Sequence, residues 1–272
     1  MNLTHPLRLR IDGLSKTYGT GSTANEVLRD INFDVHTGEF VCLVGPSGAG
    51  KTTLLRCLTS LMAPSAGQVL LDGKALTGPS PKISIVFQEY TRSLMPWMTA
   101  EKNVALALSN SKLPRATVKK MSRDALASVG LSGSESQYPW QLSGGMQQRV
   151  AIARALITEP EVLVMDEPFA SIDAQTRLEL EDLTRRLQTE RKMTVMLVTH
   201  DIDEAVYLAD RIVVLSKNPA TVQEIVEVNL GVERDQFTTR ESHQFGELRS
   251  HVLGLIREAQ NRAKTEAASG PQ

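Results

Sequence analysis

Two stretches of the chain carry residue types that could act on a nucleotide. The first is Gly45-Pro-Ser-Gly-Ala-Gly-Lys51-Thr52. Its glycines let backbone N–H groups approach phosphate oxygens, Lys51 can place a positive charge between the β- and γ-phosphates, and the Thr52 hydroxyl can ligate Mg²⁺. The apolar run Phe40–Val44 precedes the loop and a helical pattern follows it. This context predicts a phosphate site at the N-terminus of a helix.

The second stretch is the apolar run Val162–Met165, which ends in Asp166 and Glu167. Taken alone, two adjacent carboxylates at the tip of a strand are typical of a solvated turn. Beside a phosphate loop they gain separate roles. Asp166 is expected to join the Mg²⁺ shell, and Glu167 to accept a proton from the water that attacks the γ-phosphate.

The apolar periodicity predicts the elements that position these groups. Leu7, Leu9 and Ile11 alternate with polar residues, a period of two that predicts a half-buried antiparallel strand. A helix is expected after the phosphate loop, continuing through Leu61 until Pro64 stops it. Further strands are expected at Val27–Val35, Gln68–Leu71, Ile83–Phe87, Thr194–Thr199 and Arg211–Leu215. The alternation of strands and helices predicts a parallel sheet with helices on both faces.

Helical patterns fill residues from about 91 to 157, as an inserted subdomain would. Ala174–Lys192 reads as an amphipathic helix, and residues 217–240 are polar and mixed. A last amphipathic helix places Phe245, Leu248, Val252 and Ile256 at core spacing, after which residues 263–272 are expected to fray. We therefore expect one domain over residues 7–240, followed by a C-terminal helix and tail over residues 241–272.

Composition excludes several classes of protein. Lys and Arg number 30 against 31 Asp and Glu, a balance that argues against a nucleic-acid binder. The two cysteines, Cys42 and Cys57, are expected to be buried free thiols in a reducing cytoplasm. The sequence has neither an apolar run of about 18 residues nor a secretory signal at its start. We expect a cytosolic protein that serves a membrane only through a partner.

A third stretch, Leu142-Ser-Gly-Gly-Met-Gln147, lies between the phosphate loop and the carboxylate pair. With the parts in this order, residues 7–216 resemble the ATP-binding-cassette (ABC) ATPases, in which this stretch is the signature loop. The resemblance implies an α/β fold: a P-loop NTPase core with a parallel sheet and flanking helices, an N-terminal antiparallel β subdomain, and an inserted α-helical signature subdomain. It also implies that two copies of the chain enclose two ATP molecules with Mg²⁺.

The resemblance further implies a role for each motif residue. Tyr18 would stack on adenine, and the phosphates would be bound by Gly45, Pro46, Ser47, Gly48, Ala49, Gly50, Lys51, Thr52 and Thr53. The implied Mg²⁺ ligands are Thr52, Gln88 and Asp166. The implied catalytic residues are Glu167 as base, His200, which orients the γ-phosphate and the base, Lys51 and Gln88. The residues implied to reach the ATP held by the other copy are Ser143, Gly144, Gly145, Gln147 and Asp173.

Some of these residues also have ordinary structural explanations. Tyr18 is in itself a strand-end tyrosine, and a histidine at a strand end, such as His200, is more often structural. Asp173 suits a helix N-cap, which is compatible with a role at the dimer interface. The signature has Met146 where many members have glutamine, and Ile172 stands where leucine is common. Neither change removes a group that acts on ATP, so activity is expected.

A finer resemblance follows Gln88, where the segment Glu89–Thr99 contains Ser93-Leu-Met-Pro-Trp97. This run resembles the importer ATPases for nitrate, sulfonate, taurine and bicarbonate. The resemblance implies a membrane permease whose short cytoplasmic helix enters a groove here. A solute-binding protein would act indirectly, and the chain would lie peripherally on the cytoplasmic face of the cell membrane. Pro96 and Trp97 are equally explained by a packed turn.

Three other functions compete with transport. DNA-maintenance ATPases share this head but separate the phosphate loop from the signature by a long coiled coil, and no sustained heptad pattern lies between Lys51 and Ser143. Translation-factor-like proteins carry two cassettes in one chain, whereas this chain has one. A non-catalytic nucleotide sensor remains, and replacement of Glu167 by Gln would distinguish it.

Overall fold

The computed structural model describes residues 6–89, 93–217 and 219–268, with the side chains of Ser22 and of residues 264–268 left aside. The chain divides into two compact units, which are described separately. The first unit comprises residues 1–80 and 194–272, and the second comprises residues 81–193. Tyr90, Thr91 and Arg92, where the helical subdomain and part of the importer-like segment were expected, lie outside the described residues.

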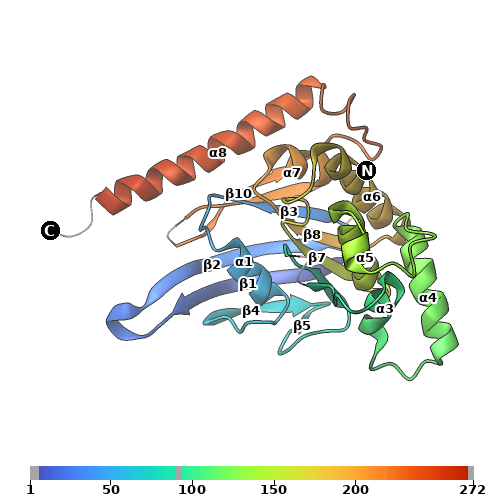
Figure 1. The fold of residues 1–272 in the computed structure, drawn as a ribbon. Helices are drawn as coiled ribbons and strands as arrows, with labels where there is room; N and C mark the ends of the chain where they lie inside the picture. Colours follow the sequence, from blue (N-terminus) through green and yellow to red (C-terminus); the bar gives the residue numbers. More distant parts are fainter. Residues whose placement is uncertain (1–5, 90–92, 218, 269–272) are drawn as a thin grey trace. The chain divides into compact units, whose positions relative to one another are not determined.

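An antiparallel sheet forms the N-terminal part of the first unit (Figure 1). Its strands run in the order β2-β1-β4-β5, and their bounds are β1 (Leu7–Tyr18), β2 (Asn25–His36), β4 (Ala66–Leu71) and β5 (Lys74–Ala75). A short 3-10 turn, Gly21–Thr23, joins β1 to β2. Leu9, Ile11 and Leu14 are buried along β1, so the alternation in the sequence correctly predicted a half-buried strand.

The second sheet of this unit carries the strand that enters the phosphate loop. Its order is β10-β9-β3-β8, with β3 (Phe40–Val44) paired in parallel to both β8 (Thr194–Val198) and β9 (Arg211–Leu215). Every residue of β3 and β8 is buried, as continuous apolar runs in a parallel sheet require. β10 (Val222–Glu227) pairs antiparallel to β9. The sequence did not predict β10 because its polar residues mask the pattern of an edge strand.

Two short helices pack against strands of this second sheet. α1 (Lys51–Leu58) follows β3, and α7 (Ile202–Leu208) lies between β8 and β9. α1 ends earlier than predicted, because Ser60 takes a left-handed φ of 54° and leaves Leu61 exposed. Cys42 in β3 and Cys57 in α1 are both free and buried, as expected. Burial raises the pKa of the Cys57 thiol, which disfavours its reactive thiolate.

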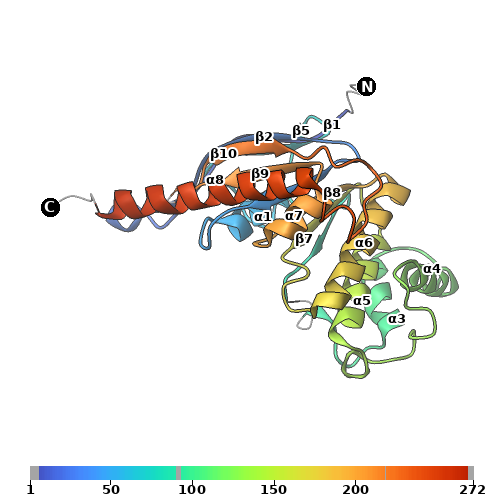
Figure 2. The ribbon, with the colours of Figure 1, turned by 90° about the horizontal axis from the view of Figure 1, so that it is seen from above.

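The long helix α8 (His243–Ala268) completes the first unit. It packs against α7, β9 and β10 through a buried face that includes Phe245, Val252, Leu255 and Ala259 (Figures 1 and 2). Arg249 of α8 also forms a 2.7 Å ion pair with Asp203 of α7. The helix was expected to fray from Ala263, yet it continues to Ala268, because Ala, Lys and Glu favour helix.

The second unit is mainly helical. The described residues of this unit include two strands, β6 (Ile83–Val86) and β7 (Val162–Asp166), which are parallel neighbours. Its helices are α3 (Ala100–Ala105), α4 (Arg115–Ser128), α5 (Gly144–Leu156) and α6 (Ala174–Arg191), with 3-10 turns at Leu106–Leu108 and Pro139–Gln141. The subdomain predicted between the two strands is therefore present. The α/β class is confirmed, with a mixed rather than purely parallel sheet in the first unit.

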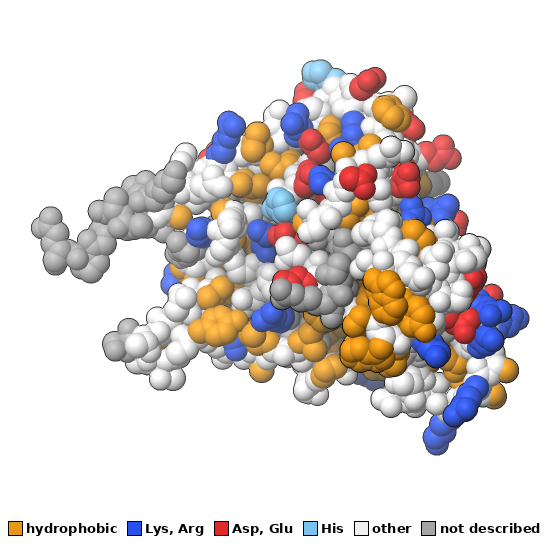
Figure 3. All heavy atoms as spheres, in the orientation of Figure 1, with side chains coloured by type: hydrophobic (Ala, Val, Ile, Leu, Met, Phe, Trp, Pro, Cys, Tyr) orange, Lys and Arg blue, Asp and Glu red, His pale blue; other side chains and the backbone are white. Residues whose placement is uncertain are grey.

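A buried amide holds the turn that precedes α3. Asn103 is fully buried; its Nδ2 donates to the carbonyl oxygens of Met95, Met98 and Thr99, and its Oδ1 accepts the Met95 N–H. These bonds fix the backbone of the turn while Trp97 remains 69% exposed. Figure 3 shows hydrophobic side chains gathered on the surface around α3. Trp97 is thus an exposed side chain on an ordered turn.

Candidate nucleotide-binding and hydrolysis site

The phosphate loop connects β3 to α1 within the first unit. Lys51 is the first residue of α1 and only 8% exposed, and its Nζ donates to the carbonyl oxygens of Gly45 (3.0 Å) and Pro46 (3.3 Å). The ammonium therefore lies against the carbonyls that begin the loop. Gly48 and Ser47 are exposed at its turn. A loop of this kind offers backbone N–H donors and a lysine to a phosphate chain.

Packing restricts two of the loop glycines. A Cβ atom on Gly45 would lie 3.0 Å from the carbonyl oxygen of Leu215. One on Gly50 would lie 2.7 Å from Val27 Cγ1 and would also need the left-handed φ of 76° that only glycine adopts readily. The loop is consequently pressed between the end of β9 and strand β2. Gly48 also has a φ of 76°, and a Cβ atom there would lie at ordinary contact distance, 3.6 Å, from the end of the Lys217 side chain.

Tyr18 and His200 belong to the same unit as the phosphate loop. The Tyr18 hydroxyl lies 3.3 Å from Thr53 Oγ1 in the first turn of α1, so the tyrosine lies beside the loop, and its stacking on adenine stays a prediction. His200 follows β8, the parallel neighbour of β3. The carboxyl ends of parallel strands meet at one edge of a sheet, where ligands bind. His200 is exposed there.

The backbone on either side of His200 is held by hydrogen bonds. Asp201 is the N-cap of α7, and its Oδ1 accepts the N–H groups of Asp203 (2.9 Å) and Glu204 (3.2 Å). Its own N–H donates to Thr199 Oγ1 over 3.0 Å. The histidine therefore sits on a fixed connection between strand and helix.

The carboxylate pair ends strand β7 in the second unit. Asp166 is the last strand residue and is buried, whereas Glu167 is half-buried. Glu167 has a φ of 43°, in the left-handed region that costs a non-glycine residue conformational energy. Its Oε2 accepts a 3.3 Å hydrogen bond from Gln88 Nε2. Gln88 follows β6, the neighbour of β7, so the structure brings these two predicted catalytic residues together.

The signature loop begins helix α5 in the same unit. Ser143 is the N-cap, and its Oγ accepts the Met146 N–H over 3.3 Å. Ser143 and Gly144 are exposed, whereas Gly145 is buried. Gln147 points back into the loop, where its Nε2 donates to the carbonyl oxygens of Pro139 (2.9 Å) and Leu142 (3.1 Å). Its contact with ATP stays a prediction.

Asp173 begins helix α6. Its Oδ1 accepts the Thr176 N–H over 3.0 Å, as expected of an N-cap. This bond holds the pKa of the Asp173 carboxyl below its ordinary value. Thr176 also packs on the signature loop, since its Cγ2 would lie within 3.0 Å of a Cβ atom on Gly145. Thr176 thus connects the Asp173 loop to the signature.

The predicted site residues divide between the two units. The first unit holds Tyr18, His200 and the loop from Gly45 to Thr53. The second holds Gln88, Asp166 and Glu167 together with the signature loop and Asp173. An ammonium and a glycine-rich turn fit a phosphate chain, and the hydroxyl of Thr52, the amide oxygen of Gln88 and the carboxylate of Asp166 are oxygen ligands of the kind Mg²⁺ takes.

Comparison with known proteins identifies the family. A family model described as ABC transporter matches residues 28–170, more than half of the chain. The chain belongs to the ABC transporter family. It is therefore an ABC-type ATPase, as the order of its motifs predicted, and the fold expected for the family is confirmed.

Individual relatives of this ABC protein span nearly its whole length. The aliphatic sulfonates import ATP-binding protein SsuB of Bacillus licheniformis is 44% identical over 91% of this chain and 92% of its own. The bicarbonate transport ATP-binding protein CmpD of Synechocystis sp. is 41% identical over 91% and 88%. An uncharacterized ABC transporter ATP-binding protein of Methanocaldococcus jannaschii is 44% identical over 93% and 92%.

A solved structure of an ABC cassette agrees with the fold. The dimeric cassette MJ0796, in a post-hydrolysis state bound to ADP and Pi, is 32% identical with a TM-score of 0.72. The match covers 81% of this chain and 99% of that one.

Several residues around the ABC motifs could not be found from the sequence. Thr176 and Asn103 make packing contacts and hydrogen bonds that no sequence motif indicates. Arg154 of α5 donates to the Ser93 carbonyl oxygen (2.6 Å) and to Ser93 Oγ (2.8 Å), which ties the importer-like segment to the signature helix. Lys217 lies beside the phosphate loop. The contacts of Thr176, Arg154 and Lys217 join residues far apart in the chain, whereas those of Asn103 are local.

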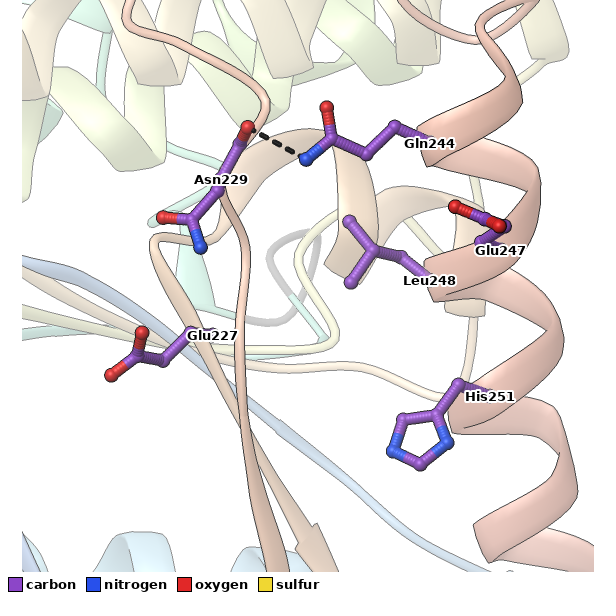
Figure 4. Close-up of a pocket in the computed structure, with 6 residues that line it drawn as sticks. All are labelled: Glu227, Asn229, Gln244, Glu247, Leu248 and His251. Carbon is purple, nitrogen blue, oxygen red and sulfur yellow. Dashed lines mark hydrogen bonds between the residues drawn. The ribbon is translucent and has the colours of Figure 1, made fainter.

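A separate hollow lies between β10 and α8 in the first unit (Figure 4). It has a volume of about 290 Å³ and is lined by Glu227, Asn229, Gln244, Glu247, Leu248 and His251. Gln244 Nε2 closes one side by donating to the Asn229 carbonyl oxygen over 3.0 Å. None of the predicted nucleotide residues lines it.

Proposed function

We propose that this ABC ATPase is the nucleotide-binding subunit of an importer. Two copies of the chain enclose two ATP molecules, and hydrolysis drives uptake of a small solute through a membrane permease. The ATPase domain covers residues 7–240, with a helical part from about 91 to 157, and residues 241–272 form its C-terminal helix and tail. The subunit lies at the cytoplasmic face of the cell membrane, without binding nucleic acid.

Each set of residues has a defined task in hydrolysis. Tyr18 stacks on adenine, while Lys51 and the glycine amides neutralise the phosphates. Mg²⁺, held by Thr52, Gln88 and Asp166, supplies positive charge to the phosphate oxygens. Glu167 takes the proton of the attacking water.

The bond from Gln88 orients one oxygen of Glu167, so that the other can face the water. His200 donates to the γ-phosphate and to the base.

The exposure of the signature is the observation that carries the two-copy arrangement. Ser143 and Gly144 stand exposed at the N-terminus of the thirteen-residue helix α5. Such an end attracts anions through its free N–H groups and its dipole. In the proposed dimer it meets the γ-phosphate held by the phosphate loop of the other copy, with Gly145, Gln147 and Asp173 beside it. Loss of the γ-phosphate then removes the link between the copies.

An exposed aromatic surface suits the permease contact. Trp97 is 69% and Trp140 is 66% exposed, and Trp140 stacks on Tyr138 with ring centroids 4.6 Å apart. Exposed aromatic side chains on an ordered backbone are typical of protein interfaces. None of the helices that the structure describes is long and apolar enough to cross a membrane. We therefore assign the membrane passage to a separate permease that contacts the Gln88–Trp97 region.

The solute is proposed to be a small anion of the nitrate, sulfonate, taurine or bicarbonate type. Support comes from the Ser93–Trp97 run and from the relatives named for sulfonates and bicarbonate. The ATPase does not touch the solute, which a periplasmic or extracellular binding protein would select. Co-purification of the permease, followed by binding assays on its solute-binding protein, would identify the solute.

A concentration series tests the two-copy mechanism. Specific ATPase activity of the purified chain should rise with protein concentration, because each active site needs two copies. Adding a Lys51→Ala, Glu167→Gln double variant, which keeps its signature loop but cannot hydrolyse ATP, should restore activity to dilute wild-type chain. The proposal would be contradicted if the activity per chain stayed constant over a range of concentrations in which gel filtration shows only monomer.

A further inference from the structure

A second lysine stands next to the phosphate loop. The Nζ and Cε atoms of Lys217 each lie 3.6 Å from the position that a Cβ atom on Gly48 would occupy. Gly48 is the exposed glycine at the turn of the loop. In the part of the chain that the structure describes, Lys217 makes no hydrogen bond or ion pair of its own. A half-buried ammonium thus lies beside the loop with its donors unused.

The segment that carries Lys217 is built against the loop. It follows β9, whose last residue, Leu215, is in contact range of Gly45. Directly before the lysine, Ser216 donates its N–H to the Thr221 carbonyl oxygen (2.9 Å), and its Oγ lies 2.8 Å from Thr221 Oγ1. These bonds close the turn at its base, so the start of the lysine side chain is fixed.

The far side of the same turn is bonded to strand β2. Ala220 donates to the Val27 carbonyl oxygen and accepts the Arg29 N–H, both over 2.9 Å. Val27 is the residue against which Gly50 packs. Phosphate loop, β2 and the β9–β10 turn therefore form one packed arrangement, which presents two lysines, Lys51 from inside the loop and Lys217 from beside it.

We propose that Lys217 is a second phosphate-binding residue for the nucleotide. The inference rests on the proposed nucleotide site. The glycine segment of a phosphate loop cradles the α- and β-phosphates, whereas its lysine reaches the β- and γ-phosphates. Because Lys217 lies against the glycine segment, its ammonium serves the phosphates that ATP and ADP share. It thereby holds the nucleotide in both states without distinguishing them.

Binding measurements on purified chain test this assignment. Calorimetric titration with ADP, with a non-hydrolysable ATP analogue and with adenosine should be compared for wild type, Lys217→Gln and Lys217→Arg. Loss of one charge-assisted hydrogen bond in Lys217→Gln should lower the affinity for ADP and for the ATP analogue about tenfold, by similar factors. Adenosine, which has no phosphate, should bind wild type and Lys217→Gln alike. Lys217→Arg should retain the wild-type affinity.

Matched variants separate this inference from the proposed site itself. Lys74→Gln, on exposed strand β5, removes the same charge at a distance in the chain and should leave ADP affinity unchanged. If Lys51→Ala loses ADP while Lys217→Gln binds it normally, the assignment of Lys217 is wrong and the nucleotide site stands. If wild type binds no nucleotide, or Lys51→Ala binds as wild type does, the proposed site fails first.

Two further outcomes decide between binding and folding roles. Equal losses of ADP and adenosine in Lys217→Gln would overturn the phosphate assignment. If that variant melts at a lower temperature, the ratio of its ADP and adenosine affinities still decides, because a folding defect reduces both together.

Discussion

Gln88 donates from Nε2 to Oε2 of Glu167 over 3.3 Å, joining the residues that follow two adjacent strands. One oxygen of the proposed base is thereby engaged, while Glu167 itself sits in a left-handed conformation with a φ of 43°. This hydrogen bond limits how the carboxylate of the proposed base can turn. The arrangement supports a catalytic role for Glu167 over that of a solvated turn.

Replacement of Glu167 by Gln should separate binding from hydrolysis. The amide keeps its size and can still accept from Gln88, but it cannot take a proton. We expect ATP binding to persist, dimers to accumulate with ATP, and phosphate release to fall by roughly 10²–10⁴-fold. Gel filtration with ATP and a phosphate-release assay measure both. Unchanged release would favour a nucleotide sensor or another base.

Two substitutions at Ser143 should have different effects. Ser143→Arg fills the exposed N-terminus of α5 and should abolish hydrolysis, while the isolated chain still binds ATP through its own phosphate loop. Ser143→Ala removes only the N-cap bond to Met146 and should lower the free energy of unfolding by about 1 kcal/mol. Nucleotide titration and thermal unfolding report the two effects. If the Ser143→Arg monomer no longer binds ATP, the assignment of Ser143 to the ATP held by the other copy is wrong.

Gly145 and Thr176 should be coupled. Ala at position 145 would place its Cβ within 3.0 Å of Thr176 Cγ2, so Gly145→Ala should displace α5 from α6 and lower both melting temperature and ATPase activity. Thr176→Ser removes that methyl group and should restore part of both in the double variant. A double-mutant cycle should give a coupling energy of about 0.5–3 kcal/mol. Simple additivity would show that the contact is not limiting.

Asp173 should make stability depend on acid pH. Its pKa is lowered in the folded chain by the Thr176 N–H, so the carboxylate stabilises the folded state. That contribution is complete above the unfolded value of about 3.9 and is lost as the pH falls through the lower folded value. Asp173→Asn keeps an N-cap acceptor without a charge, so its stability difference from wild type should shrink toward acid pH. Denaturant unfolding across pH 2–7 measures this.

Arg154 should matter for coupling more than for basal activity. It anchors Ser93, four residues before the exposed Trp97, to the signature helix. Arg154→Lys keeps the charge but cannot form the same paired bonds. We expect basal ATPase activity to be largely kept and stimulation by the permease to fall. Reconstituted transport with the wild-type and variant subunits tests this, and equal stimulation would remove Arg154 from the coupling path.

Local patterns predicted most of the fold. The buried strands β3, β7 and β8 and the helix α6 follow from uninterrupted apolar runs and helical spacing, and α5 lies within the predicted helical stretch. Strand β10 escaped because an edge strand need not hide its polar side chains, and α1 stopped early because a left-handed residue, Ser60, ended it. The nucleotide motifs were also visible, since their chemistry lies in consecutive residues.

What the sequence could not supply was the support around those motifs. The packing of Thr176 and the anchor from Arg154 join residues distant in the chain, and the inward turn of Gln147 depends on the conformation of its loop. The same holds for Lys217, which no motif includes. Tertiary contacts decide these roles, so only the folded chain reveals them.

The crowding around Gly45 and Gly50 bears on how other sequences of this kind should be interpreted. Val27 and the left-handed φ of Gly50 exclude a Cβ atom there, and Leu215 leaves little room for one on Gly45, whether or not a nucleotide is present. A related chain that no longer binds ATP would therefore still need these two glycines for its fold. Gly48 also has a left-handed φ of 76°, but its nearest neighbour is the flexible end of Lys217 at 3.6 Å, so packing constrains it less. Loss of Gly48 together with Lys51 would therefore be an earlier sign of a cassette that no longer hydrolyses ATP.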